Sequence, residues 1–225
     1  MTDNRSGLRW FFGVPFRYQT YRNIAFLLLA FPLGMTYFIA ITVGLSVGAG
    51  LALTLVGLPL LLLTLLVVGY IGQFEARLAS LLLQIDVDPP EVASPSSDDD
   101  LSSIDGLTTA AGRLVASRTT WMSLVFVLLK FAYGVVAFTT VVTASAIVGA
   151  LVTLPLFYDT PNMVYTVGVH SVDSFTDALA GGLLGVGLAF ISFHILNGLA
   201  KIGGCLTEIL LTPDGDWSNT DDVSG

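Results

Sequence analysis

Few side chains in this sequence could do chemistry, and most of these lie within apolar stretches. His194, Asn197 and Lys201 are separated by three and four residues, which places them on one face of a helix, and Glu208 follows two turns beyond Lys201. Because histidine titrates near neutral pH, this polar stripe could respond to pH or carry a proton. Hydrogen bonding between helices would explain His194 and Asn197 without any activity, so both interpretations stay open.

Lys130 is the second candidate, because a charged side chain well inside an apolar segment requires an explanation. A charge in the bilayer interior costs roughly 2.5 to 3.5 kcal/mol unless it reaches the headgroups or finds a partner. We expect the Lys130 side chain to extend to the cytoplasmic headgroups, as long cationic side chains do near membrane surfaces. A binding role is the alternative.

The segment 157–177 is the third candidate site, because it is the largest polar connection between two apolar segments. It contains Asp159, His170 and Asp173, so a stimulus from outside the cell would meet these residues first. The alternative is a solvated connection with no role in recognition.

The sequence gives no sign of an active site. No nucleophile and base, and no set of metal ligands, recur at helical spacing. The one cysteine, Cys205, leaves no pair for a disulfide or a metal site. We therefore expect a protein without enzymatic activity, cofactor or metal. Nucleic acid is not an expected partner, because a phosphate-binding surface needs clustered Lys and Arg.

Composition indicates an all-α, polytopic membrane protein. Hydrophobic residues make up 54% of the 225 residues and charged residues only 12%. The stretch from Asn23 to Phe74 has no charged residue or histidine and would form a helix of roughly 78 Å, against a hydrocarbon core of about 30 Å. It must therefore cross twice, turning near Ser46 to Gly50. Residues 131–158 and 178–200 predict two further crossings, giving four transmembrane helices.

The chain also resembles itself at an offset of 100 residues. Thr20, Phe26, Leu28, Leu29, Phe31, Gly34 and Phe38 align with Thr120, Phe126, Leu128, Leu129, Phe131, Gly134 and Phe138. This pattern predicts a duplicated hairpin. Because each copy would cross the membrane an even number of times, we expect two tandem, parallel repeats related by an axis along the membrane normal. The four helices should then form a bundle of paired hairpins.

The distribution of Lys and Arg predicts the orientation. These residues precede the first crossing, lie between the second and third, and follow the fourth, whereas the two other connections contain none: Arg5, Arg9, Arg17 and Arg22; Arg77, Arg113 and Arg118; Lys201. Cytoplasmic flanks carry the excess of Lys and Arg. We therefore expect a multi-pass protein of the cell membrane with both termini and the central linker in the cytoplasm.

These features divide the chain into five segments. Residues 1–22 form a cytoplasmic or interfacial segment, residues 23–85 the first repeat with a cytoplasmic helical extension, and residues 86–106 an acidic disordered linker. Residues 107–211 form the second repeat, and residues 212–225 an acidic tail. The net charge is −8, and dense exposed carboxylates favour a halophilic archaeon as the host.

Three short motifs carry a resemblance to a known family. They are Phe31-Pro32-Leu33-Gly34-Met35-Thr36-Tyr37-Phe38, Val56-Gly57-Leu58-Pro59-Leu60, and Arg118-Thr119-Thr120-Trp121. Over residues 8–211 the chain resembles the sensor domain family of prokaryotic membrane proteins, a four-helix module often fused to a histidine kinase. The second copy departs from the first, with Lys130 and Ala132 where Ala30 and Pro32 stand. The resemblance implies a module that receives a signal, and it transfers no binding or catalytic residue.

The leading hypothesis is a non-enzymatic sensor that relays a membrane or extracellular cue to a separate signalling partner. The partner would be cytoplasmic or in the membrane, such as a histidine kinase; the lipid bilayer and a second copy of the chain are the other candidate partners. The alternative is a small transporter or permeation accessory protein that uses Lys130, His194, Asn197 and Lys201. A membrane scaffold protein is the third hypothesis.

Overall fold

The structure is a computed structural model with five helices and one small hairpin in the part of the chain that it describes. The described residues are 17–54, 56–85, 87, 89–90, 104–160, 165–168 and 170–211. The elements are α2 (Tyr18–Gly50), α3 (Gly57–Leu83), α4 (Ile104–Ala116), α5 (Arg118–Phe157), β1 (Thr166–Val167), β2 (His170–Ser171) and α6 (Phe175–Leu211). The expectations for residues 1–16, for most of the 86–106 linker and for the 212–225 tail lie outside the described residues.

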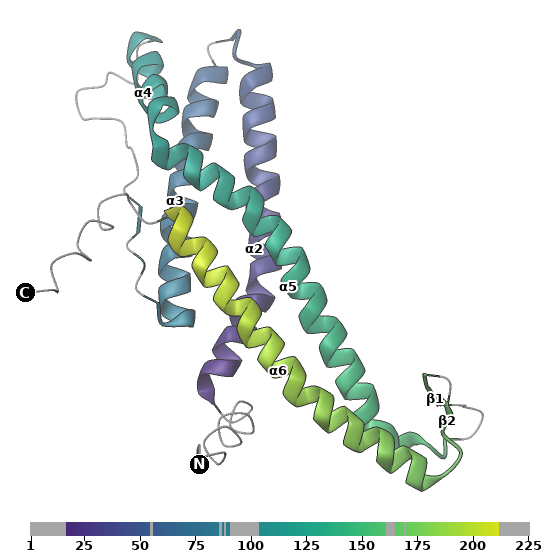
Figure 1. Cartoon of the computed structure of the whole chain (residues 1–225). Coiled ribbons are helices and arrows are strands. Elements are labelled where there is room, and N and C mark those ends of the chain that lie inside the picture. Colours follow the sequence, from purple (N-terminus) through teal and green to yellow (C-terminus); the bar gives the residue numbers. More distant parts are fainter. Residues whose placement is uncertain are drawn as a thin grey trace, which may run out of the picture.

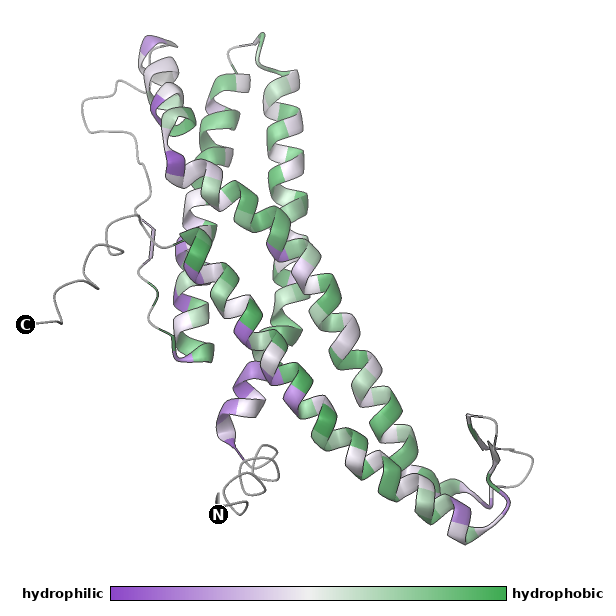
Figure 2. Cartoon of the chain, viewed as in Figure 1, coloured by the Kyte–Doolittle hydropathy of each residue, from purple (hydrophilic) through white to green (hydrophobic). Residues whose placement is uncertain are grey.

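The predicted four long apolar helices are confirmed. Helices α2, α3, α5 and α6 contain 33, 27, 40 and 37 residues, and each is long and apolar enough to cross a membrane. Hydrophobic residues extend along all four, whereas hydrophilic residues gather at the start of α2, in α4 and near the loop after α5 (Figure 2). The chain is therefore a multi-pass membrane protein. The first turn lies later than expected, since α2 continues to Gly50.

Local sequence signals explain several helix ends. Ser174 precedes α6, and its Oγ accepts a hydrogen bond from the Asp177 backbone N–H while donating to the Asp177 carboxylate, an arrangement close to a capping box. Helix α3 ends where Gln84 adopts the left-handed conformation, with φ of 56°. Pro32 lies inside α2, where the Thr36 hydroxyl donates to the Pro32 carbonyl at 2.7 Å. This bond engages the carbonyl of the proline itself, whereas the carbonyl that loses its N–H donor to Pro32 is that of Leu28, four residues earlier.

The relative direction of the helices differs from the expectation of parallel copies. Helix α2 packs antiparallel to α5, because Phe31 stacks on Phe138 and Phe38 stacks on Phe131. The α2–α3 turn and the α5–α6 connection accordingly lie at opposite ends of the molecule (Figure 1). The expectation of parallel hairpins is therefore wrong for this packing. The Lys and Arg residues before α2 and α5 predict parallel helices, but they lie outside the apolar contact, where Gly34 and Gly134 allow antiparallel packing.

Small residues permit the close approach of α2 and α5. A Cβ atom added to Gly34 would lie 3.0 Å from the Lys130 carbonyl oxygen, and one added to Gly134 would lie 2.6 Å from the Ala30 carbonyl oxygen. Backbones approach this closely in membrane helices only where side chains are absent or very small. The crossing of α2 and α5 therefore depends on these two glycines.

The buried apolar side chains form two large sets in the region where the four long helices meet, and two smaller sets lie toward the ends of the helix assembly. Phe26, Val68, Phe126 and Val127 have no exposed surface and come from α2, α3 and α5, while Leu211 of α6 closes the same region. Helix α4 packs through Ala110 and Leu114 against Leu62 of α3. The overlap of the four helices is thus the best-packed part of the molecule and the place where buried polar groups need partners.

Candidate functional site

A buried ion pair joins α3 to α5 at the centre of the helix assembly. The Lys130 ammonium donates to the Glu75 carboxylate with a distance of 2.7 Å between Nζ and Oε2. Lys130 is 2% exposed and Glu75 is fully buried. A charge is retained in such surroundings when it is paired, because an isolated charge in a medium of low dielectric constant is very costly.

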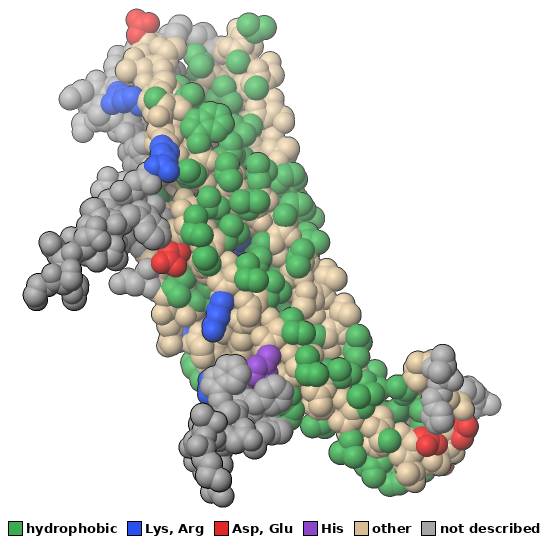
Figure 3. Space-filling view, in the orientation of Figure 1, with side chains coloured by type: hydrophobic (Ala, Val, Ile, Leu, Met, Phe, Trp, Pro, Cys, Tyr) green, Lys and Arg blue, Asp and Glu red, His purple; other side chains and the backbone are tan. Residues whose placement is uncertain are grey.

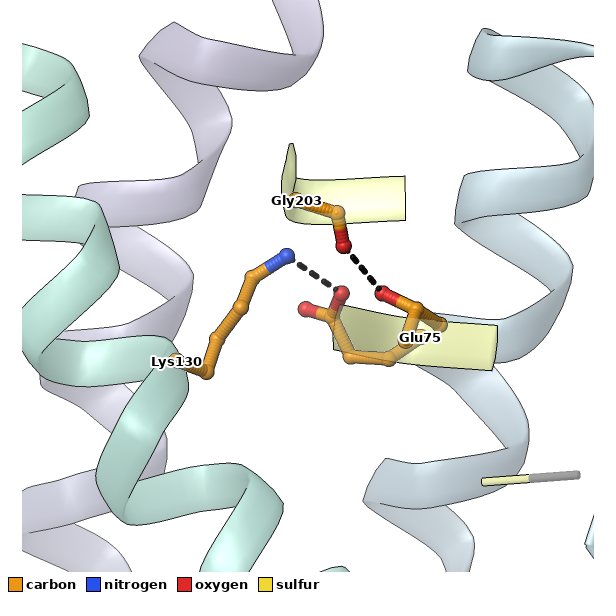
Figure 4. Close-up of polar contacts among 4 residues, drawn as sticks. Glu75, Lys130 and Gly203 are labelled. Carbon is orange, nitrogen blue, oxygen red and sulfur yellow. Dashed lines mark hydrogen bonds and ion pairs between the residues drawn. The ribbon is translucent and has the colours of Figure 1, made fainter. Parts of the chain in front are cut away.

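The two other long helices enclose this pair. On α2, the ring of Phe26 lies 4.4 Å from the Lys130 Nζ, within the range of a cation–π contact, and the ring of Phe126 on α5 lies 5.9 Å away. Gly203 of α6 lies beside the pair, where its carbonyl accepts a hydrogen bond from the buried Thr207 hydroxyl (Figure 4). Side chains or backbone of α2, α3, α5 and α6 thus surround one pair of charges.

The second carboxylate oxygen of Glu75 faces another buried polar group. Neither Glu75 Oε1 nor the Tyr37 hydroxyl has a hydrogen-bond partner within 3.5 Å among the described residues, but the two side chains interact electrostatically. The ion pair therefore has a neighbouring acceptor and donor that are not engaged in this conformation.

The environment of Lys130 corrects the expectation that its side chain extends to the headgroups. Glu75 is the first charged residue after the apolar stretch that begins at Asn23, so the sequence pattern alone gives no reason to place it inside the bilayer. One signal could have found it: Glu75 follows Ile71 and Gly72 at spacings of four and three, so all three lie on the buried face of α3. The role of Lys130 in sensing remains a prediction.

The polar stripe on α6 meets the start of α2 through a chain of amide hydrogen bonds. Gln19 Nε2 donates to Asn23 Oδ1 at 2.9 Å and to the Leu82 carbonyl at 3.0 Å. Asn23 Nδ2 donates to Asn197 Oδ1 at 2.8 Å, and Asn197 Nδ2 donates to the Thr20 hydroxyl at 3.3 Å. This network ties α2 to both α3 and α6, and Asn23 and Gln19 were not recognised from the sequence.

A cavity of about 280 Å³ lies beside this network, and it brings together three of the predicted site residues. His194, Asn197 and Lys201 line it together with Arg17. Lys or Arg and His side chains are exposed close together beside the start of α2, on a face otherwise covered mainly by apolar side chains (Figure 3). His194 Nδ1 also pairs with the Phe190 carbonyl at 2.8 Å.

Two other predicted residues do not join this cavity. Glu208 is exposed on α6 and is not among the residues that line it. Lys130 belongs to the buried ion pair instead. Its Nζ contacts the ring of Phe26, which lies about one helical turn after Asn23 on α2. The residues that the sequence grouped as one transport path therefore fall into two clusters.

The connection between α5 and α6 contains a short hairpin in its described part. Strands β1 and β2 pair antiparallel, and Val172 packs with Leu154 and Ala178 beneath them. Asp159 and Asp173 are exposed, and the Asp173 carboxylate accepts a hydrogen bond from Ser171 at 2.7 Å. The backbone of His170 pairs in β2, and its side chain lies outside the described part of the chain. Among the described side chains, no hydrogen bond or ion pair joins Asp159 to Asp173.

Comparison with known proteins gives a family but no characterised relative. Searches of curated proteins and of solved structures found no match. A family model described as Putative sensor matches residues 26–211, which include the α2–α5 crossing, the Glu75–Lys130 pair and the α6 side of the cavity beside the amide network. The match covers most of the 225 residues and agrees with the resemblance found in the three short motifs. The chain therefore belongs to the Putative sensor family.

Proposed function

We propose that this protein is a non-enzymatic sensor module that changes its helix packing in response to a membrane or extracellular cue and relays the change to a separate signalling partner. The observation that carries this proposal is the Glu75–Lys130 pair, which lies where four membrane helices meet. The family supports a sensing role in general terms. The relay and the partner are our inference.

The buried pair is suited to hold one of two packing states. A charge pair in a medium of low dielectric constant is costly to separate, so α3 and α5 stay together until other interactions compensate the loss. Tyr37 lies next to Glu75 and provides a donor with which the carboxylate could pair after a small shift. A cue that moves α2 relative to α3 would therefore alter the contacts of Glu75 directly.

The end of α3 is the surface that we propose for the partner. Phe74 and Leu81 are 50% and 67% exposed, and Phe74 immediately precedes Glu75 on the same helix. A movement at Glu75 would thus be transmitted along a rigid helix to an exposed apolar face. Ile71, Leu82 and Ile85 do not belong to this exposed face, because they pack inside the protein.

Site-specific photo-cross-linking tests the relay. A photoreactive residue at Leu81 should give an adduct with a signalling protein such as a histidine kinase in host membranes, identified by mass spectrometry. The same residue at Leu183 of α6, which is also 67% exposed, is the matched control and should give lipid adducts. Lys130→Met should change the yield at Leu81. Equal adducts at both positions, or a yield that Lys130→Met leaves unchanged, would contradict the proposal.

Transport remains the second hypothesis, and liposomes distinguish it. A transporter needs a polar path, whereas the Lys130 and Glu75 charges are paired and Phe26 separates them from the cavity lined by Lys201. We expect purified protein in liposomes to give no specific flux of protons or solutes. A flux abolished by Lys130→Met would replace the sensor proposal by the transport one.

We also propose, from the distribution of Lys and Arg, that both termini face the cytoplasm. Arg17 before α2 and Lys201 of α6 line the same cavity, which supports a common cytoplasmic location for these two basic residues. The antiparallel packing of α2 and α5 makes the start of α5 the informative position for a labelling experiment.

A further inference from the structure

The cavity between the start of α2 and the middle of α6 has the chemistry of an anion site. Arg17 and Lys201 line it and are both exposed, and neither has a carboxylate partner among the residues that the structure describes. No Asp or Glu is among its lining residues. Two cations facing one cavity repel each other unless an anion lies between them.

The neutral lining adds directed hydrogen-bond donors. Asn23, which is 8% exposed, and Asn197 each use one amide N–H within the described network, so each retains a second N–H. The Gln19 contacts to Asn23 and to the Leu82 carbonyl hold these amides in place. Fixed donors of this kind combine with a guanidinium and an ammonium in sites that bind phosphate.

The start of α2 also favours a bound anion. Its N-terminal end carries a partial positive charge, no acidic residue lies in its first turn, and the side chain of Arg17 does not cap it. Arg17 thus places a full charge beside the positive end of the helix dipole. The helix end strengthens a site that the cavity and its side chains already define.

Two apolar cavities lie near this polar one along α6, although neither shares a lining residue with it. A cavity of about 90 Å³ is lined by Ile24, Phe193 and Leu196, which are the chain neighbours of Asn23, His194 and Asn197. That cavity shares Ala144, Val148 and Ser192 with an apolar groove of about 660 Å³ between α5 and α6. A polar site followed by an apolar groove fits a molecule with an anionic head and a long apolar tail.

We propose that this cavity binds the phosphate of an anionic phospholipid, with an acyl chain along the groove between α5 and α6. Arg17 and Lys201 neutralise the phosphate, Asn23 and Asn197 donate to its oxygens, and the apolar groove receives the chain. The site deepens the proposed sensor function by naming a membrane cue, because a bound lipid would join α2 to α6 next to Phe26 and the ion pair. The test below measures binding alone, so its outcome is separate from that of the cross-linking experiment.

Binding is measured with the full chain in detergent and fluorescent phosphatidylglycerol or phosphatidylcholine as the probe. Phosphatidylglycerol should bind more tightly than phosphatidylcholine. Arg17→Gln and Lys201→Met should each weaken phosphatidylglycerol binding about fivefold, since one basic residue contributes about that factor to anionic lipid binding. Lys201→Arg should retain most of the affinity. Arg77→Gln removes the same charge from an exposed position on α3 outside the cavity and should have little effect.

Two further variants and a competitor complete the test. Asn197→Asp places a negative charge in the cavity at nearly unchanged volume and should abolish the preference for phosphatidylglycerol. Thermal unfolding without lipid identifies any variant that fails to fold, and Arg17 and Lys201 lie outside the core. Equal binding of the two lipids, or equal weakening by Arg77→Gln, would overturn the proposal. Displacement of the lipid by millimolar inorganic phosphate would also overturn it, because the site would then bind free phosphate.

Discussion

Gly34 of α2 and Gly134 of α5 lie at the crossing of their helices, each against the backbone four residues before the other glycine. Two aromatic stacks flank this crossing, Phe31 on Phe138 and Phe38 on Phe131, with ring centroids 5.0 and 4.7 Å apart. Phe31 and Phe38 correspond to Phe131 and Phe138 at the offset of 100 residues, so each stack joins a residue of one copy to the counterpart of its neighbour in the other. These reciprocal contacts favour the predicted duplication, with an axis perpendicular to the two helices; the duplication itself remains a prediction.

Adding one methyl group at the crossing should destabilise the protein. In Gly134→Ala the new Cβ would lie 2.6 Å from the Ala30 carbonyl oxygen, so α2 and α5 must separate. Overpacking of this kind costs about 1–3 kcal/mol. Gly149→Ala on the same helix is the control, because its Cβ would meet nothing within 4 Å. Thermal unfolding in detergent measures both variants, and equal stabilities would contradict the importance of the crossing.

Removing one partner of the buried ion pair should cost more than removing both. Lys130→Met leaves the Glu75 carboxylate buried without its cation, and Glu75→Gln does the converse, so each single variant should lose about 3–5 kcal/mol of unfolding free energy. The double variant should recover much of this loss. Glu208→Gln, an exposed carboxylate on α6, is the control for a lost charge. Additive single effects would show that the two side chains are not coupled.

The hydroxyl of Tyr133 should contribute measurably to the contact between α5 and α6. It donates to the Leu199 carbonyl at 2.9 Å. Tyr133→Phe removes this bond and should lower the unfolding free energy by about 0.6 kcal/mol, the average for hydrogen bonds between membrane helices. Tyr70→Phe, at a position 57% exposed, should have no measurable effect. A larger loss for Tyr70→Phe would refute this assignment.

Cysteine labelling in intact cells should reveal how the two hairpins lie in the bilayer. After the exposed Cys205 is replaced by serine, single cysteines are introduced at Tyr18, Thr54 and Ser117. If the antiparallel packing of α2 and α5 persists in the membrane, Thr54 and Ser117 are labelled from one side and Tyr18 from the other. The charge pattern alone predicts that the cysteines at Tyr18 and Ser117 are labelled from the same side of the membrane. That second result would mean that the hairpins reorient on insertion.

Much of the fold could be predicted because it depends on local sequence properties. A long run of apolar residues without charge can satisfy its backbone in a bilayer only as a helix, so the four crossings follow from composition and length. The stripe of His194, Asn197 and Lys201 could also be placed on one face, since helical spacing is fixed. These conclusions needed no knowledge of any other segment.

The tertiary structure decided which of these elements meet. Glu75 is an ordinary charged residue in the sequence, and only the packing of α3 beside α5 makes it the buried partner of Lys130. Arg17 and Asn23 likewise gain a role only because the start of α2 lies against α6. The sequence pattern predicts that α2 and α5 are parallel, whereas their contact in the structure is antiparallel. The physical reason is that helical periodicity and hydrophobicity are properties of one segment, whereas partners and directions depend on the shapes of two surfaces at once.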